Sequence, residues 1–415
     1  MAILKAFKGI RPIKDKVSQL ASRPYDVLNS EEAAIEVEGN PFSFLHVVKP
    51  EIDLPAETDH YSKEVYLKAK VNFEKLLKEG VLFKDQTACI YIYQLRMNGR
   101  KQNGIVGCAA VDDYINNVIL KHELTRPDKE EDRKNHVRIS NIHAEPVFFA
   151  YKAHKELDEY IWDIVNQSTP EYDFTTEDGI GHSFWVVDNP VKIQNIIELF
   201  SQLKNTYVAD GHHRTAAAAL VGNERRLNNP NHNGTEEYNY FLAVHFPDNQ
   251  LQIMDYNRLI KDLNGHSQED LLSELNKSFE IEDKGTLIHK PTSLHNFGMY
   301  MNGKWYSLTA KSGTYNDLDP IGVLDVTILS EKILSPILNI KDLRTDKRID
   351  FVGGMRGLEE LEKRVNSGEM KLAFSLYPVS MKQLIDIADS GNIMPPKTTW
   401  FEPKLRSGLV IHSLE

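Results

Sequence analysis

The sequence of 415 residues contains only two cysteines, Cys89 and Cys108. Two thiols are too few for a disulfide framework or for a zinc site made of cysteines. Both lie among apolar residues, so we expect buried core thiols and a cytoplasmic protein. The N-terminal residues contain no apolar run of signal-peptide length, and no stretch approaches the ~18 apolar residues of a membrane span. We therefore expect neither secretion nor a membrane-embedded chain.

The sequence also lacks an excess of positive charge, because its formal net charge is -11. Binding to nucleic acid or to an anionic membrane depends on clustered cations. We therefore expect no nucleic-acid partner and no membrane partner, although a local basic pocket remains compatible with this charge. There is no internal repeat and no low-complexity tract.

Helical and strand patterns are mixed along the chain, which predicts the α/β (α+β) class. The length favours several lobes, and we place them at residues 1–155, 156–285 and 286–415. A homodimer is left open. The expected strands cover residues 44–48, 88–93, 102–108, 147–151, 205–209, 240–246, 298–301, 305–308, 349–352 and 372–377, with hairpins at 98–99 and 302–303. The expected helices cover residues 60–80, 157–167, 190–203, 215–220 and 267–279, one that Thr125 caps, one after Gly354, and one with a capping box of Ser380 and Gln383.

The strongest motif is Asp210-Gly211-His212-His213-Arg214-Thr215, between a strand pattern and an alanine-rich helix pattern. A helix N-terminus has unpaired N–H groups and a partial positive charge, so it attracts anions. Gly211 permits a tight turn, and Arg214 suits bidentate contact with phosphate. Asp210 can orient a histidine or hold a metal ion. A zinc or iron site on the histidines and a solvated helix start remain as alternatives.

Two further motifs carry clustered cations. The segment 122–136 places Lys129 and Arg133 at helical spacing behind His122 and Glu123, and such a face suits a phosphate or a carboxylate. Its alternative is a solvated helix. The segment 344–357 ends in a glycine pair that can present backbone amides to an anion, or can simply form a tight turn. Its candidate residues are Arg344, Arg348 and Arg356.

Two segments near the chain ends complete the candidates. Residues 395–408 place Lys397, Lys404 and Arg406 in a loop stiffened by proline, which either lines the pocket or wraps the surface. Near the N-terminus, Pro24 restrains the chain beside Asp26, a carboxylate that can be held in one position.

Residues 210–215 resemble the signature of the ParB/sulfiredoxin-like superfamily, in the variant found in free-serine kinases. The whole chain is similar to a family of long bacterial proteins with five motifs: Pro-Tyr-Asp-Val, His-Glu-x-Thr, Asp-Gly-His-His-Arg, Arg-Thr-Asp-x-Arg and Pro-Pro-Lys-x-Thr-Trp-Phe-x-Pro-Lys. The resemblance implies a ParB/sulfiredoxin-like core with large insertions and a C-terminal α/β extension. It also implies that Asp26 occupies the place of a catalytic glutamate in those kinases.

The resemblance favours a phosphotransferase that acts on a small hydroxy amino acid, with free L-serine first. The donor would be ATP, ADP or pyrophosphate, with Mg²⁺ as cofactor and Asp210 as its ligand. The catalytic candidates are Asp26, Asp210 and His213; the donor-binding candidates are Gly211, His212, Arg214, Thr215, Lys397, Lys404 and Arg406. One alternative is a metal-dependent phosphohydrolase that acts on phosphoserine. Another is a nucleotide-gated DNA clamp, against which the net charge argues.

Overall fold

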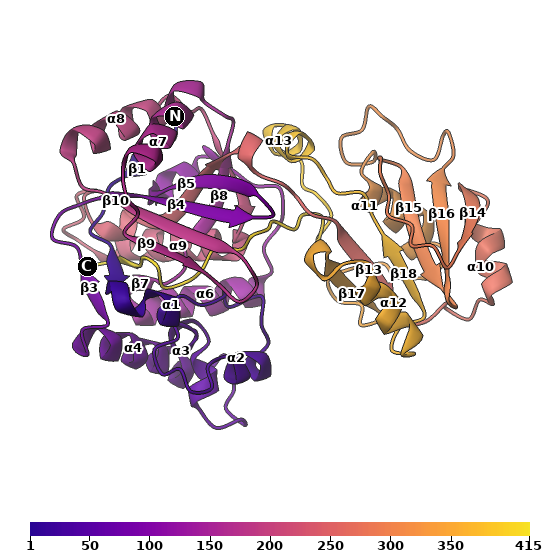
Figure 1. Ribbon diagram of the computed structural model, residues 1–415, viewed down its shortest axis with the longest axis horizontal. Coiled ribbons are helices and arrows are strands. Elements are labelled where there is room, and N and C mark those ends of the chain that lie inside the picture. The colour runs from indigo at the N-terminus through magenta and orange to yellow at the C-terminus, as the bar shows by residue number, and fades with distance from the viewer. The chain divides into compact units, whose positions relative to one another are not determined.

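The computed structural model describes residues 1–415 and divides the chain into two compact units (Figure 1). Unit 1 comprises residues 1–121, 125–251 and 403–415, and unit 2 comprises residues 122–124 and 252–402. The expected boundary at residue 155 does not coincide with this division, because strands from both sides of it join one sheet. The last thirteen residues return to unit 1, so that unit is discontinuous in sequence.

Unit 1 is built on a nine-stranded mixed sheet with the strand order β6-β11-β8-β12-β5-β4-β10-β9, and β1 pairs with β5. Its strands are β1 (Leu4–Lys5), β4 (Ile90–Met97), β5 (Arg100–Ala110), β6 (Ile119–Leu120), β8 (Val147–Tyr151), β9 (Tyr172–Thr175), β10 (Gly181–Val187), β11 (Thr206–Asp210) and β12 (Tyr240–Pro247). Two short pairs lie outside it: β2 (Ile10–Pro12) with β3 (Leu82–Lys84), and β7 (Ile142–His143) with β19 (His412–Ser413).

The helices of unit 1 cover the sheet and add a separate apolar cluster. They are α1 (Val17–Leu20), α2 (Ser30–Glu36), α3 (Leu45–Val48), α4 (Lys63–Lys78), α5 (Val111–Ile115), α6 (Pro127–Ser140), α7 (Lys155–Gln167), α8 (Pro190–Phe200) and α9 (His212–Asn228). On β8, Val147 and Phe149 belong to the cluster that contains Ala218 of α9, and Tyr151 belongs to the cluster of α7 and α8. Since residues two apart on a strand share a face, both helix groups cover the same face of the sheet.

Unit 2 is an antiparallel sheet with the strand order β14-β16-β15-β18-β13-β17. Its strands are β13 (Tyr256–Ile260), β14 (Phe279–Gly285), β15 (Asn296–Met301), β16 (Lys304–Ala310), β17 (Ile349–Gly353) and β18 (Leu372–Ser375). Its helices are α10 (Gln268–Leu275), α11 (Asp325–Leu329), α12 (Glu359–Asn366) and α13 (Met381–Asp389). Leu358, the N-cap residue of α12, and Leu361 within that helix pack with Leu259 and Trp305 into a buried core.

The mixed α/β class is confirmed, and so are both hairpins, β4–β5 and β15–β16. The capping box of Ser380 and Gln383 is confirmed as well. The strand expected at residues 44–48 is wrong, because this apolar stretch forms the short helix α3 inside a helical cluster. Thr125 is not the cap of α6; the helix has Arg126 at its N-cap and a proline in its first turn.

Both cysteines are buried and free, as expected. No helix in the structure combines the length and the hydrophobicity that crossing a membrane requires.

Candidate functional site

The strand–turn–helix expected around Asp210 is confirmed. Strand β11 ends at Asp210, Gly211 is the N-cap residue, and α9 begins at His212. Gly211 has a φ of 91°, a left-handed conformation that disfavours any residue with a Cβ atom. No side chain caps the first turn of α9, and a helix start of this kind can bind an anion through its backbone N–H groups.

Asp210 is held in its ionised form by cations. One carboxylate oxygen accepts the Gly211 N–H at 2.9 Å, and the other accepts the Lys404 ammonium at 3.1 Å. Burial alone would raise the pKa of Asp210, but Lys404 and Arg214 lower it to about 2. The C-terminal segment and the helix start, 194 residues apart in the chain, therefore meet at this carboxylate.

Arg214, in the first turn of α9, contacts Asp26 of the N-terminal motif. Its Nη2 atom lies 3.9 Å from Oδ2 of Asp26, and its Nη1 atom donates to the Pro146 carbonyl at 2.6 Å. The Nε atom of Arg214 is buried and has no hydrogen-bond partner in the protein. The Asp26 side chain is 40% exposed, whereas that of Arg214 is only 10% exposed. One guanidinium nitrogen is thus held by the backbone, and the partly exposed Asp26 carboxylate lies beside another.

Sequence analysis did not identify Glu145, a buried carboxylate next to this pair. One of its oxygens accepts the Tyr25 N–H at 3.0 Å and the Ser407 hydroxyl at 2.9 Å. Burial raises the pKa of Glu145, and the charge of Asp26 raises it further, while Arg214 opposes both effects. Its one signal in the sequence was its position as a lone acidic residue between two apolar strands.

Arg133 is a second cation near Glu145, and its charge also lowers the pKa of that carboxyl group. Its guanidinium donates to Asp132 at 2.9 Å and sits 4.0 Å from the ring centre of Tyr25, so it is both paired and stacked. A cavity of about 30 Å³ is lined by Arg133, Arg214 and Glu145, together with His136 and His143. This volume has room for about one water molecule.

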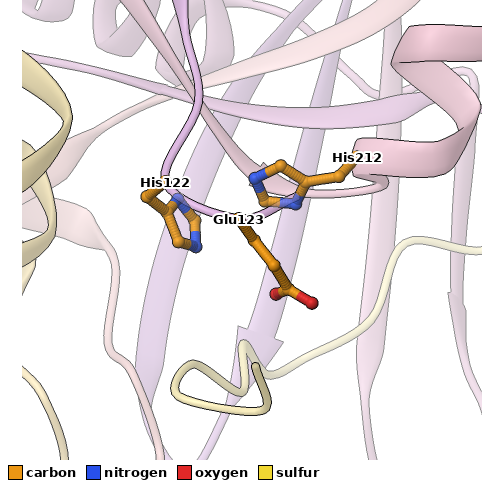
Figure 2. A group of neighbouring side chains, drawn as sticks. All are labelled: His122, Glu123 and His212. Atoms are coloured by element: carbon orange, nitrogen blue, oxygen red, sulfur yellow. The ribbon is translucent and has the colours of Figure 1, made fainter. Parts of the chain in front are cut away.

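The two histidines of the motif differ in what they can do. His213 accepts the backbone N–H of Arg126 through Nε2 at 3.0 Å, so its proton resides on Nδ1. Burial lowers the pKa of His213, which keeps the ring neutral at pH 7. His212 is buried at the first residue of α9 (Figure 2). Figure 2 also labels His122 and Glu123, which follow β6, the parallel neighbour of β11 in the sheet.

Other candidates in unit 1 make contacts of their own. Arg406 donates to Asp178 at 2.6 Å, and its backbone N–H donates to the Tyr93 hydroxyl. The Lys129 ammonium donates to the hydroxyl of Tyr61. Thr215 is fully buried, and its hydroxyl donates to the Gly211 carbonyl, so it closes the first turn of α9.

The remaining candidates belong to unit 2. His122 contacts the Thr399 hydroxyl through Nε2 at 3.3 Å, within that unit. Lys397 is exposed and has a left-handed φ of 63°, and its carbonyl accepts the buried guanidinium of Arg258. The three arginines of the segment 344–357 are distributed as follows: Arg344 pairs with Asp342, Arg348 pairs with Asp346, and Arg356 is exposed.

The charges of the unit 1 site nearly cancel. Lys404 faces Asp210, Arg133 faces Asp132, and Arg214 faces Asp26 and Glu145. A polyphosphate therefore needs added positive charge, from a bound divalent cation or from a proton on Glu145. The arrangement offers an exposed carboxylate, fixed cations and an uncapped helix start in one place, which are parts that phosphoryl transfer uses.

Comparison with known proteins gives a family and distant structural neighbours. Residues 4–327 match the model of the family described as "Protein of unknown function (DUF1015)", so the chain belongs to that family. No curated protein is a significant match.

Three solved structures resemble parts of the chain. A conserved hypothetical protein from Pyrococcus furiosus is 14% identical, with 75% of this chain and 95% of that chain covered and a TM-score of 0.34. A free serine kinase in complex with AMP is 13% identical, with coverage of 74% and 91% and a TM-score of 0.34. SbnI with a C-terminal truncation, from Staphylococcus aureus, is 11% identical, with coverage of 74% and 87% and a TM-score of 0.40. At these TM-scores the likeness carries no conclusion about this chain.

Proposed function

We propose that this member of the DUF1015 family is a phosphotransferase that moves a phosphoryl group from a nucleotide or pyrophosphate to the hydroxyl of a small amino acid. The observation that carries the proposal is the position of Asp26, whose carboxylate lies 3.9 Å from the Arg214 guanidinium at the uncapped start of α9. A proton acceptor and an anion-binding turn stand side by side there. Phosphoryl transfer to a hydroxyl requires both.

The roles follow from the contacts. The N–H groups of the first turn of α9 and the Arg214 guanidinium would bind the donor phosphates and stabilise charge in the transition state. Asp26 would accept the proton of the attacking hydroxyl, because it is the exposed carboxylate of the group. His213, with its proton on Nδ1, would donate to a leaving oxygen. Lys404 would keep Asp210 ionised and in place.

Mg²⁺ fits this chemistry, because it prefers carboxylate and phosphate oxygens and the protein cations are already matched by carboxylates. Bound with the donor, it would neutralise charge on the phosphates. Asp210 would have to exchange the Lys404 ammonium for the metal ion in order to act as its ligand. The Asp26 carboxylate makes a single ion-pair contact, at 3.9 Å from Arg214, so it could bind the metal ion without giving up a hydrogen bond.

Free L-serine is the first acceptor to test, on the basis of the motif resemblance. ATP, ADP and pyrophosphate are the donors to compare. Lys397, Arg406, His122, Glu123, Lys129, Arg344, Arg348 and Arg356 remain predicted contributors to donor or substrate binding.

A metal-dependent phosphohydrolase is the second candidate, and the exposure of Asp26 favours it. A side chain that is 40% exposed can activate water as readily as a substrate hydroxyl. Phosphoserine would then be the substrate, and inorganic phosphate the product.

Phosphorus NMR of the protein with L-serine, Mg²⁺ and each donor in turn distinguishes these reactions. Formation of phosphoserine, lost in Asp26→Asn and retained in the matched control Asp15→Asn, supports the phosphotransferase. Release of inorganic phosphate from phosphoserine alone supports the hydrolase. If the protein produces neither, or if Asp26→Asn is fully active, the proposed function is wrong.

A further inference from the structure

Two buried histidines lie directly opposite each other where the chain end returns to unit 1. His143 of β7 and His412 of β19 are Cα partners in an antiparallel pair. Their Nδ1 atoms are 3.0 Å apart, and the two rings are inclined by only 16°. The Nε2 atom of His412 lies 2.9 Å from a carboxylate oxygen of Glu237, whose other oxygen accepts the Lys5 ammonium at 2.9 Å.

These contacts determine where the protons reside. Glu237 is ionised, because His412 and Lys5 lower its pKa to about 2 against the effect of burial. Its carboxylate can only accept, so His412 donates from Nε2 and carries a lone pair on Nδ1. His143 must then donate from its own Nδ1 atom. The lone pair of His143 is consequently on Nε2, and no protein group hydrogen-bonds to that atom.

The row of contacts from His143 through His412 to Glu237 has one end at a cavity and the other end at solvent. His143 lines the cavity of about 30 Å³ that Arg133, Glu145 and Arg214 also line. At the other end, the Glu237 side chain is 33% exposed. Both rings are nearly inaccessible, at 6% for His143 and 2% for His412. A row of hydrogen bonds therefore runs from the cavity beside the proposed site to solvent.

We propose that His143, His412 and Glu237 form a proton path, the histidine path, between this cavity and solvent. The proposal rests on the proposed function, because transfer to a hydroxyl breaks an O–H bond and releases one proton. Asp26 accepts that proton from the hydroxyl, and a water molecule in the cavity carries it to Nε2 of His143. The Nδ1 proton of His143 then moves to Nδ1 of His412, and the Nε2 proton of His412 moves to Glu237 and on to water. One proton enters and one leaves, so both rings end neutral.

The reverse sequence of moves resets the path. After the products leave, a proton from water at Glu237 moves to Nε2 of His412, the Nδ1 proton of His412 returns to Nδ1 of His143, and Nε2 of His143 releases its proton to the product-free site. Burial lowers the pKa of both histidines, so neither ring traps the proton as a stable cation. Neutral rings with complementary tautomers are what such a path requires.

A purely structural pair would make the same contacts but would move no proton. ¹⁵N NMR of the full chain with labelled histidine tests the tautomers without any substrate. We expect a proton on Nδ1 of His143 and on Nε2 of His412. In Glu237→Gln, which keeps the shape of the exposed end, exchange of the His143 N–H with solvent should slow by roughly 10-fold or more. Wild-type exchange in this variant, or the opposite tautomers, would overturn the path.

Kinetics then connect the path to the reaction. His412→Phe and Glu237→Gln should lower kcat for phosphoserine formation by about 10- to 100-fold at unchanged KM, near the lower end of acid–base effects. Both should also change the solvent isotope effect on kcat. The matched control is His245→Phe, because His245 is equally buried but has no hydrogen-bond partner. Wild-type kcat and isotope effect in both path variants would overturn the proposal.

Failure of the proposed function gives a different result. If the wild-type protein transfers no phosphate from any donor, the proposed phosphotransferase function is wrong, whichever tautomers the histidines adopt. The histidine path is then judged by NMR alone: the expected tautomers with slowed exchange in Glu237→Gln support it, and any other result rejects it. Thermal unfolding of each variant confirms that the comparison is made on folded protein.

Discussion

Replacing Arg214 with alanine is the most direct perturbation of the proposed site. The guanidinium donates to the Pro146 carbonyl at 2.6 Å, faces Asp26 at 3.9 Å and stabilises the ionised form of Glu145. The side chain is 10% exposed, so the substitution removes a buried cation as well as the proposed phosphate ligand.

The magnitude follows from these contacts. A hydrogen bond from a charged group is worth about 1.5–3 kcal/mol, and its loss also leaves the Pro146 carbonyl without that donor. We expect the free energy of unfolding to fall by roughly 2–3 kcal/mol, or a Tm decrease of about 5–10 °C for a unit of this size. Loss of one charge-stabilising donor should lower turnover by roughly 100-fold or more. Arg214→Lys should restore turnover only in part, because an ammonium cannot reproduce the two-pronged contact.

Calorimetric titration with pyrophosphate and ATP separates binding from chemistry. We expect Arg214→Ala to weaken donor binding at least 10-fold. Arg138→Ala is the control: Arg138 is 35% exposed and pairs with Glu224 at the surface, a contact worth about 0–1 kcal/mol. Normal donor affinity in a folded Arg214→Ala protein, with lost affinity in Asp26→Asn, would show that the two roles are reversed.

Three other substitutions test separate parts of the structure. Asp26→Asn should abolish turnover and keep donor affinity within about two-fold in calorimetry, whereas the exposed control Asp15→Asn should keep both. If Asp26→Asn retains turnover, Asp26 is not the catalytic base. Gly211→Ala should lower the free energy of unfolding by roughly 1–2 kcal/mol in urea, because the φ of this residue is 91° and a Cβ atom would lie 3.1 Å from a guanidinium nitrogen of Arg214. An unchanged unfolding midpoint would show that the turn does not require glycine. Burial raises the pKa of Asp325 from 3.8 to about 7, so the folded state binds an extra proton and wild-type stability falls as the pH rises from about 4 to 7. Asp325→Asn should therefore raise Tm at pH 8, by the equivalent of roughly 2–4 kcal/mol, and not at pH 4. The exposed control Asp15→Asn should change Tm at neither pH, and equal effects of Asp325→Asn at both pH values would refute the shift.

The helix start at Asp210 was predictable because its information is local. An apolar strand pattern, a glycine and an alanine-rich run follow one another within fifteen residues, and each has a strong conformational preference. The hairpins at Asn98-Gly99 and Asn302-Gly303 were predictable for the same reason. The strand expected at residues 44–48 was wrong because a short apolar run fits a buried helix equally well, and packing in the helical cluster decides between them.

From the sequence alone one can name the residue types that are candidates for the proposed chemistry: a glycine turn, a carboxylate behind a proline, and cations near the chain end. Which of these residues come into contact depends on the folded chain. It joined Asp26, Arg214 and Lys404 in one unit and assigned Lys397 to the other, because the last thirteen residues return to the first sheet. It also revealed Glu145 and the facing histidines, since burial and pairing between strands far apart in the chain leave no mark in any local pattern.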